Sequence, residues 1–290
     1  MLSQKTRVVP FSNMRLPFIA ALAFIAVAGT LRAQPKPAYE IYAIRYATLK
    51  DFAVSGLVAG ADQSRKMDIA MMFWLIEGNG RNILFDCGFY RDQFMRQWRP
   101  VDYEKPSLAL QRAGLKPDDI TDVVISHIHW DHADGFDLFP RARIWIQKEE
   151  LEYYAGEAWQ GHRRTAADPD DILGLVKANT EGKVGLVKGD EQEIFPGITC
   201  YVGGKHTWQS QFIAVNTASG TVVLASDNVY LNENLEKHVP IAATLDAGSN
   251  LRAQDRMKHM VASPRLIIAG HDPAVMKDFK EIAPGVVRIQ

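Results

Sequence analysis

A chain of 290 residues, 47% of them hydrophobic and 23% charged, has the composition of an ordinary globular protein. This length allows one large domain or two small ones, with a sizeable buried core. The formal net charge of −1 provides no excess of basic residues. A partner bound mainly through charge, such as a nucleic-acid backbone or an anionic membrane surface, is therefore excluded.

The first 33 residues have the pattern of a secretory signal peptide. Three basic residues precede an apolar run over residues 16–28, and small residues follow it. We expect cleavage after Ala28 or Ala33, so that residues 34–290 form one mature domain in the periplasm or outside the cell. An uncleaved membrane anchor is the alternative, but the run of 13 residues is shorter than the roughly 20 needed to span a bilayer.

The mature part alternates between runs typical of strands and runs typical of helices. Strands are predicted at 39–46, 69–76, 83–85, 123–126, 143–146, 198–202, 212–215, 221–225 and 266–269. Helices are predicted at 91–98, 107–113, 149–154 and 251–261. The charged stretch 161–171, which contains an Asp-Pro pair, predicts a surface loop. This interleaving predicts an α/β layered fold.

Candidate metal ligands follow four of the predicted strands. The run His127-Ile128-His129-Trp130-Asp131-His132 comes directly after the strand at 123–126, and the later strands are followed by His206, Asp227 and His271. Loops at the ends of buried strands are held in fixed positions, and functional groups are often placed there. Because imidazole and carboxylate are zinc ligands, these five histidines and two aspartates could hold two metal ions and leave a position open for water.

The other histidines and the two cysteines are interpreted as structural. His162, His238 and His259 do not follow a strand in this way, so we predict that they are not ligands. Cys87 and Cys200 could be joined in an exported protein. We expect them instead to be reduced core residues, because buried cysteine packs well as a small apolar side chain.

The ligand pattern resembles that of the metallo-β-lactamase superfamily, whose H-x-H-x-D-H signature is matched from His127 to His132. The later superfamily ligands fall in the same order on His206, Asp227 and His271. The early run Ile83-Leu84-Phe85-Asp86-Cys87-Gly88 is also similar, so that the resemblance covers essentially the mature chain. It implies an α/β fold of the αββα sandwich type, two mixed sheets with outer helices, and a metal site at one edge.

The resemblance also implies how two ions, normally Zn²⁺ although other divalent metals are possible, would be held. One ion would be bound by His127, His129 and His206, the other by Asp131, His132 and His271, and Asp227 would bridge them. Two cations that share a water lower its pKa, and the hydroxide so formed attacks a carbonyl group.

Within the superfamily, the N-acyl-homoserine lactonases, which are quorum-quenching enzymes, resemble the chain best. Tyr230 stands three residues after the bridging aspartate, as in that branch, and the run H-T-W-Q-S-Q from His206 is similar to its H-T-P-G-S-Q. Trp208 and Gln209 replace the usual Pro and Gly, and Ala133-Asp134-Gly135 replaces Ala-Gly-Gly. These differences lie near the metals, so the pocket could be shaped for another substrate.

The activity implied is hydrolysis of a small-molecule lactone or ester. Tyr230 would donate a hydrogen bond to the developing oxyanion, and Asp131 would carry a proton to the leaving alkoxide. In the lactonases, the region that corresponds to a mostly aromatic cluster after Gly88 helps to line the groove for the acyl chain, although a stripe of this kind is more often plain core: Phe89, Tyr90, Phe94, Met95 and Trp98.

Other activities of similar sites remain as alternatives. A glyoxalase II-like thioesterase would use the same ligands, but that family carries a helical C-terminal region and only residues 272–290 follow His271 here. A true β-lactamase lacks the bridging aspartate. A persulfide dioxygenase uses one iron with two histidines and an aspartate and does not need a second set of ligands. A non-enzymatic binding module would have lost ligands that this chain retains.

Overall fold

The computed structural model describes residues 38–162 and 165–289. These residues all belong to one compact unit of the chain, Lys36–Gln290. The predicted signal peptide lies outside the described residues, and its removal stays a prediction. Among the described residues, no helix is both long and apolar enough to cross a membrane.

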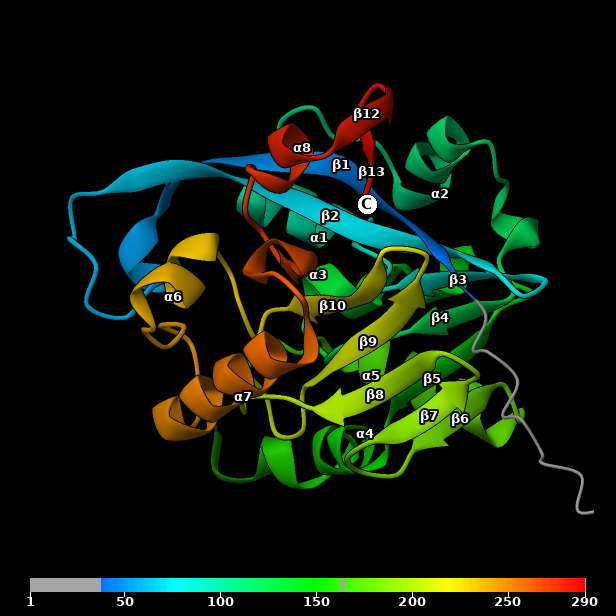
Figure 1. Cartoon of the computed structure of the whole chain (residues 1–290). Helices are drawn as coiled ribbons and strands as arrows, with labels where there is room; N and C mark the ends of the chain where they lie inside the picture. Colours follow the sequence, from blue (N-terminus) through cyan, green and yellow to red (C-terminus); the bar gives the residue numbers. More distant parts are fainter. Residues whose placement is uncertain (1–37, 163–164, 290) are drawn as a thin grey trace, which may run out of the picture. The chain divides into compact units, whose positions relative to one another are not determined.

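The strands of the described chain form two mixed sheets (Figure 1). The larger sheet has the order β12-β13-β1-β2-β3-β4-β5-β6. Its strands are β1 (Glu40–Ala53), β2 (Lys66–Gly78), β3 (Arg81–Phe85), β4 (Asp122–Val124), β5 (Arg143–Gln147), β6 (Val184–Val187), β12 (Lys280–Ala283) and β13 (Val286–Arg288). Pairing is antiparallel from β12 to β3 and parallel from β3 to β6.

The smaller sheet has the order β11-β10-β9-β8-β7. Its strands are β7 (Gln192–Phe195), β8 (Ile198–Val202), β9 (Gln211–Thr217), β10 (Gly220–Ser226) and β11 (Ile267–Ala269). The pair β10–β11 is parallel, and the other pairs are antiparallel. The carboxyl ends of β10 and β11 therefore lie at the same edge of the sheet.

Helices cover the outer face of each sheet, so the predicted αββα sandwich is confirmed. The helices are α1 (Asp92–Trp98), α2 (Pro106–Ala109), α3 (Trp130–Ala133), α4 (Lys148–Ala155), α5 (Pro169–Thr180), α6 (Asn232–Lys237), α7 (Ala247–Met260) and α8 (Val275–Asp278). Side chains alternate across each strand. In β2, Phe73 packs under the helices while Trp74 packs between the sheets. In β10, Leu224 faces the other sheet while Val223 packs with Met257 of α7.

All predicted strands and helices are present, but some elements were missed. Strands β6, β7, β12 and β13 are only three or four residues long, and most of β12 is exposed, so they carry little periodicity. The predicted loop over 161–171 was wrong at its end. Asp168 caps α5 by accepting a hydrogen bond from the Asp170 amide at 2.9 Å, and Pro169 fills the first helical position. The Asp-Pro pair thus begins a helix.

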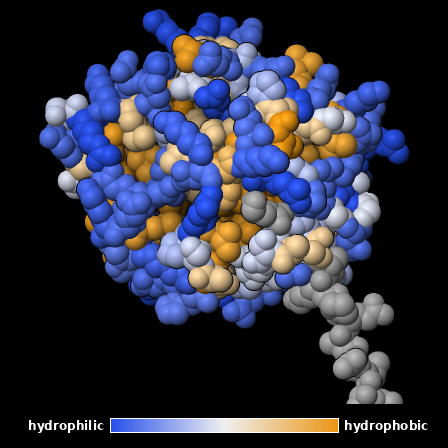
Figure 2. Space-filling view, turned by 45° about the horizontal axis from the view of Figure 1, so that its top comes forward, coloured by the Kyte–Doolittle hydropathy of each residue, from blue (hydrophilic) through white to orange (hydrophobic). Residues whose placement is uncertain are grey.

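The two cysteines are free and buried, as predicted. Cys87 lies in the core under the helices, whereas Cys200 lies in the core between the sheets. The surface seen in Figure 2 is mostly hydrophilic, with hydrophobic side chains in patches between the polar ones.

Candidate metal centre

The structure brings three of the predicted histidines together with Asp227. The imidazoles of His127, His129 and His206 and the Asp227 carboxylate each place a donor atom within 4.8 Å of the others. His206 Nε2 lies 2.9 Å from His129 Nδ1 and 3.3 Å from Asp227 Oδ2. His127 Nε2 lies 3.6 Å from the same carboxylate oxygen. These four side chains form the first donor group.

The second donor group consists of Asp131, His132 and His271, whose donor atoms also lie within 4.8 Å of one another. His132 Nε2 and His271 Nε2 lie 3.3 Å and 3.0 Å from Asp227 Oδ1. The two oxygens of Asp227 thus face different groups, the arrangement expected of a bridging carboxylate. All seven predicted ligands meet at one place, in a His/Asp cluster typical of binuclear metal sites. Of the other described histidines, His238 and His259 lie in neither group.

The ring nitrogens that point away from the cluster have partners of their own. His206 Nδ1 donates to the Ala243 carbonyl at 2.6 Å, and His271 Nδ1 donates to the Ala70 carbonyl at 3.1 Å. His132 Nδ1 donates to the buried Asp86 carboxylate at 2.9 Å. Such bonds fix the tautomer and leave Nε2 free as a metal donor. Asp86 lies in the early motif, but no local sequence pattern indicates this contact.

Several atoms aimed into the cluster are buried and lack a hydrogen-bond partner: His127 Nε2, His132 Nε2 and Asp227 Oδ1. Buried polar atoms are rarely left unpaired, so these fit ligands of a cation. Burial, and then the neighbouring His206, lowers the pKa of His129 to about 3. Burial raises the pKa of Asp227, but His132 and His271 outweigh it and hold that pKa well below its usual value. Burial lowers the pKa of His132 and His271, but the Asp227 carboxylate outweighs it and raises the pKa of both. A neutral imidazole and an ionised carboxylate are the forms that bind metals, so a cation would displace a proton from His132 and His271.

Strained backbone precedes two of these donors. Lys205, before His206, has a φ of 53°, and Ser226, before Asp227, has a φ of 46°. Left-handed conformations cost energy for residues other than glycine and concentrate at functional sites. Gly270, before His271, has a different requirement: a Cβ there would lie 2.9 Å from Asp227 Oδ1. The loops are thus held close together around the cluster.

A pocket of about 220 Å³ opens onto the cluster, and Tyr230 lines it beside the donors. The Tyr230 ring centre lies 5.5 Å from that of His206 and 5.8 Å from that of His271. Burial, and then the carboxylates of Asp227 and Asp131, raises the pKa of the Tyr230 phenol well above its usual value. The phenol therefore keeps its proton at neutral pH and can donate a hydrogen bond.

The rest of the pocket wall is mostly apolar. It comes largely from β1, β2 and the residues between them: Leu49, Phe52, Leu57, Ile69 and Met71. Of the predicted aromatic cluster, only Trp98 belongs to this lining. Phe89 and Phe94 instead pack against Trp130 in the core, at ring-centre distances of 4.7 and 4.8 Å. The prediction that this cluster helps to line the groove therefore fits Trp98, whereas Phe89 and Phe94 fill the core beneath the pocket.

The residues that depart from the lactonase pattern do not belong to the pocket lining. Trp208 stacks on Tyr153 of α4 at 4.1 Å with an interplanar angle of 6°. The Gln209 side chain donates to Glu149 of the same helix at 3.1 Å. Asp134 is buried and lies 3.0 Å from the Arg91 guanidinium. These residues therefore contact the elements that surround the site and do not line the pocket itself.

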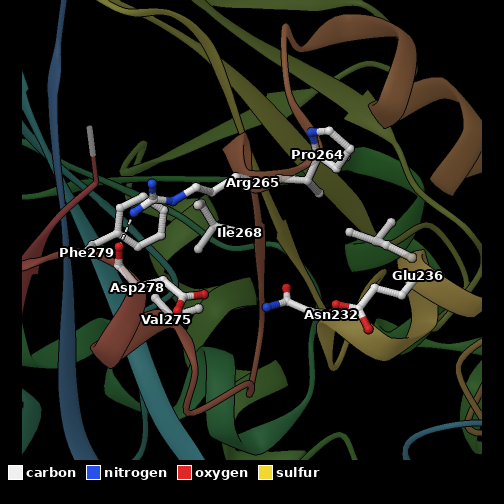
Figure 3. A pocket seen from close by; sticks show the side chains of 10 residues that line it. Asn232, Glu236, Pro264, Arg265, Ile268, Val275, Asp278 and Phe279 are labelled. Atoms are coloured by element: carbon white, nitrogen blue, oxygen red, sulfur yellow. Dashed lines mark hydrogen bonds between the residues drawn. The ribbon is translucent and has the colours of Figure 1, made fainter.

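A second pocket, of about 230 Å³, lies between α6, β11 and α8 (Figure 3). Its Arg265 guanidinium lies 5.0 Å from the Phe279 ring centre and donates to the Asp278 carbonyl. None of its lining residues belongs to either donor group. This pocket is therefore separate from the His/Asp cluster.

An αββα sandwich with a two-group His/Asp centre and an apolar pocket defines a metal-dependent hydrolase class. The sequence profile of the metallo-beta-lactamase superfamily matches residues 72–271. The chain belongs to this superfamily.

Its relatives include N-acyl homoserine lactonases. The chain is 31% identical to the one from Bacillus cereus over 191 residues, which are 65% of this chain and 70% of that protein. It is similar to the crystal structure of a mutant of AiiA from B. thuringiensis with N-decanoyl-L-homoserine bound at the active site. The TM-score is 0.69 at 25% identity, over 86% of this chain and 98% of that one. A structure of an N-acyl homoserine lactone hydrolase with N-hexanoyl-L-homoserine at its catalytic metal centre matches with the same four values.

Proposed function

We propose that this protein is a dinuclear zinc hydrolase that opens a lactone ring of the N-acyl-homoserine lactone type. The observation that carries the proposal is the Asp227 carboxylate, which turns one oxygen to each donor group. The lactonase relatives and the apolar wall of the adjoining pocket support it, because an acyl chain needs an apolar groove. Other small-molecule esters or thioesters remain the alternative substrates.

Each side chain has a separate task in this reaction. When bound, two divalent cations would supply Lewis acidity and an activated water at neutral pH. His127, His129 and His206 would hold one, Asp131, His132 and His271 the other, and Asp227 both. Tyr230 would donate a hydrogen bond from its phenol to the oxyanion that develops on the carbonyl oxygen. Asp131, the more exposed of the two aspartates at the cluster, would return a proton to the leaving alkoxide.

Tyr230→Phe is expected to slow lactone hydrolysis roughly 5- to 100-fold while metal content stays unchanged. Loss of one hydrogen bond to an oxyanion costs on the order of 3 kcal/mol, and Lewis acidity at the same oxygen reduces this cost. Steady-state rates on lactones and on aryl esters, with elemental analysis, measure the effect. Tyr201→Phe, in β8 but outside both donor groups and the pocket lining, is the matched control. If Tyr230→Phe hydrolyses every carbonyl substrate at the rate of the parent protein, Tyr230 has a structural role and does not contact the oxyanion.

We also propose that the chain is exported and then acts in the periplasm or outside the cell. The basic start and the apolar run over residues 16–28 support this. Terminal sequencing of protein from the native host is expected to find a start at Gly29 or Gln34. Soluble cytoplasmic protein with an intact Met1 would show that export does not occur.

A further inference from the structure

One buried carboxylate outside the donor groups joins the loops that supply them. Glu150 is the third residue of α4 and is fully buried. Helix α4 follows β5 without a connecting loop, and β5 is the parallel neighbour of β4. The first turn of α4 therefore emerges beside the loop that follows β4 and carries the H-x-H-x-D-H run. An acidic residue in a first helical turn is also favoured by the helix dipole.

The two oxygens of Glu150 accept hydrogen bonds from two different loops. Oε1 accepts from the backbone amide of Ile128 at 3.1 Å. Oε2 accepts from the backbone amide of Gln209 at 2.6 Å. Ile128 lies between His127 and His129, and Gln209 lies three residues after His206. The carboxylate thus connects the loops that carry all three histidines of the first donor group.

These loops come from different sheets, so their spacing is not set by strand pairing within one sheet. The loop after β4 belongs to the larger sheet, and the loop between β8 and β9 belongs to the smaller one. A buried charge is costly unless it is well bonded, and charge-assisted bonds to backbone amides are among the stronger hydrogen bonds. The stack of Tyr153 on Trp208 holds the same helix against the His206 loop. Helix α4 therefore contacts the His206 loop through Tyr153 and joins it to the loop after β4 through the buried Glu150 carboxylate.

We propose that Glu150 is a positioning residue of the metal centre, which fixes the His127–His129 loop relative to the His206 loop so that their imidazoles converge. This inference rests on the metal site of the proposed function. Glu150 does not bind the ion itself, because both of its oxygens are directed to backbone amides. Its effect would reach the metal through the placement of the three histidines.

The test compares Glu150→Gln with Glu149→Gln in the full mature protein. The first change keeps the side-chain volume but turns an NH₂ group towards one of the two amides, so at least one bond is lost. The second is the same change one residue earlier, on an exposed side chain that accepts a hydrogen bond from the Gln209 side chain. Zn²⁺ affinity by chelator competition is expected to fall about 10- to 100-fold for Glu150→Gln and to stay at the parent value for Glu149→Gln.

Amide hydrogen exchange of the metal-free proteins is the second readout. Exchange at Ile128 and Gln209 is expected to speed up in Glu150→Gln while the strands of both sheets keep the parent rates. Parent Zn²⁺ affinity in Glu150→Gln, or faster exchange throughout the domain, would overturn the proposal. If Glu150→Gln does not fold, Glu150→Asp, which keeps the charge on a shorter side chain, replaces it. A failure of that variant to fold would assign Glu150 to overall folding and would also overturn the proposal.

The two proposals fail in different ways. Zn²⁺ binding and lactone hydrolysis by the parent protein test the proposed function. The ratio of affinities between the Glu150 and Glu149 variants tests the positioning role. A parent that binds two ions, with both variants equal to it, leaves the proposed function in place and removes this inference.

Discussion

Removal of divalent ions with a chelator is expected to abolish hydrolysis, and Asp227→Ala is expected to lose at least one of two bound ions. The Asp227 carboxylate lies 3.0–3.6 Å from donor atoms of both groups. Its loss removes a donor from each ion and leaves four buried imidazoles facing one another. Lewis-acid stabilisation of a transition state contributes several kcal/mol, so the rate should fall at least about a thousandfold.

Elemental analysis and rate measurements on lactones, esters and thioesters check this expectation. Asp118→Ala, on the exposed surface, is the control and should keep two ions and the parent rate. An Asp227→Ala protein that stays fully loaded would contradict the bridging role. One redox-active iron per chain in the parent would instead favour the dioxygenase alternative.

Arg91→Met is expected to lower the free energy of unfolding by about 3–5 kcal/mol at pH 7. The Arg91 guanidinium lies 3.0 Å from Asp134 and 2.7 Å from Asp171, and both carboxylates are fully buried. Removal of the cation leaves the negative charge of this buried carboxyl pair without a counter-charge. Denaturant unfolding measures the loss, and Arg96→Met, exposed on the same helix, is the control.

The pH dependence of this loss follows from the protonation of the pair. Burial, and then the Asp134 carboxylate, raises the pKa of Asp171 from 3.8 to about 8 against the opposing effect of Arg91. Because the folded pKa is raised, the stability contributed by this proton is complete below about pH 4 and is lost as the pH rises towards 8. Burial also raises the pKa of Asp134, and Arg91 lowers the pKa of both groups. Arg91→Met should therefore raise both pKa values further, so that the folded variant takes up protons that the folded parent does not. The difference between parent and Arg91→Met should then shrink as the pH falls from 7 to 4. A difference that stays constant over this range would show that Arg91 acts through packing instead.

The sequence by itself determined the fold class and the identity of the cluster. The candidate ligands follow apolar runs with β-favouring residues, and in a layered α/β fold such strand ends are brought to a common edge. Four candidates also lie within one stretch of six residues, from His127 to His132, where chain connectivity alone keeps them close. For these reasons the seven residues could be named, and Tyr230 could be placed near them, before their positions in space were known.

Only the tertiary structure decided how the cluster is supported and what surrounds it. The Asp86 contact with His132 joins residues 46 apart in the chain, and the Gln209 contact with Glu150 joins residues 59 apart. The wall from Leu49 to Met71 also lies far in sequence from the ligands it faces. Local periodicity shows which face of a strand is buried but not which distant residue meets it. Which distant residues meet depends on how the two sheets and their helices pack. Phe89 and Phe94, for example, lie in the core because they pack against Trp130 there.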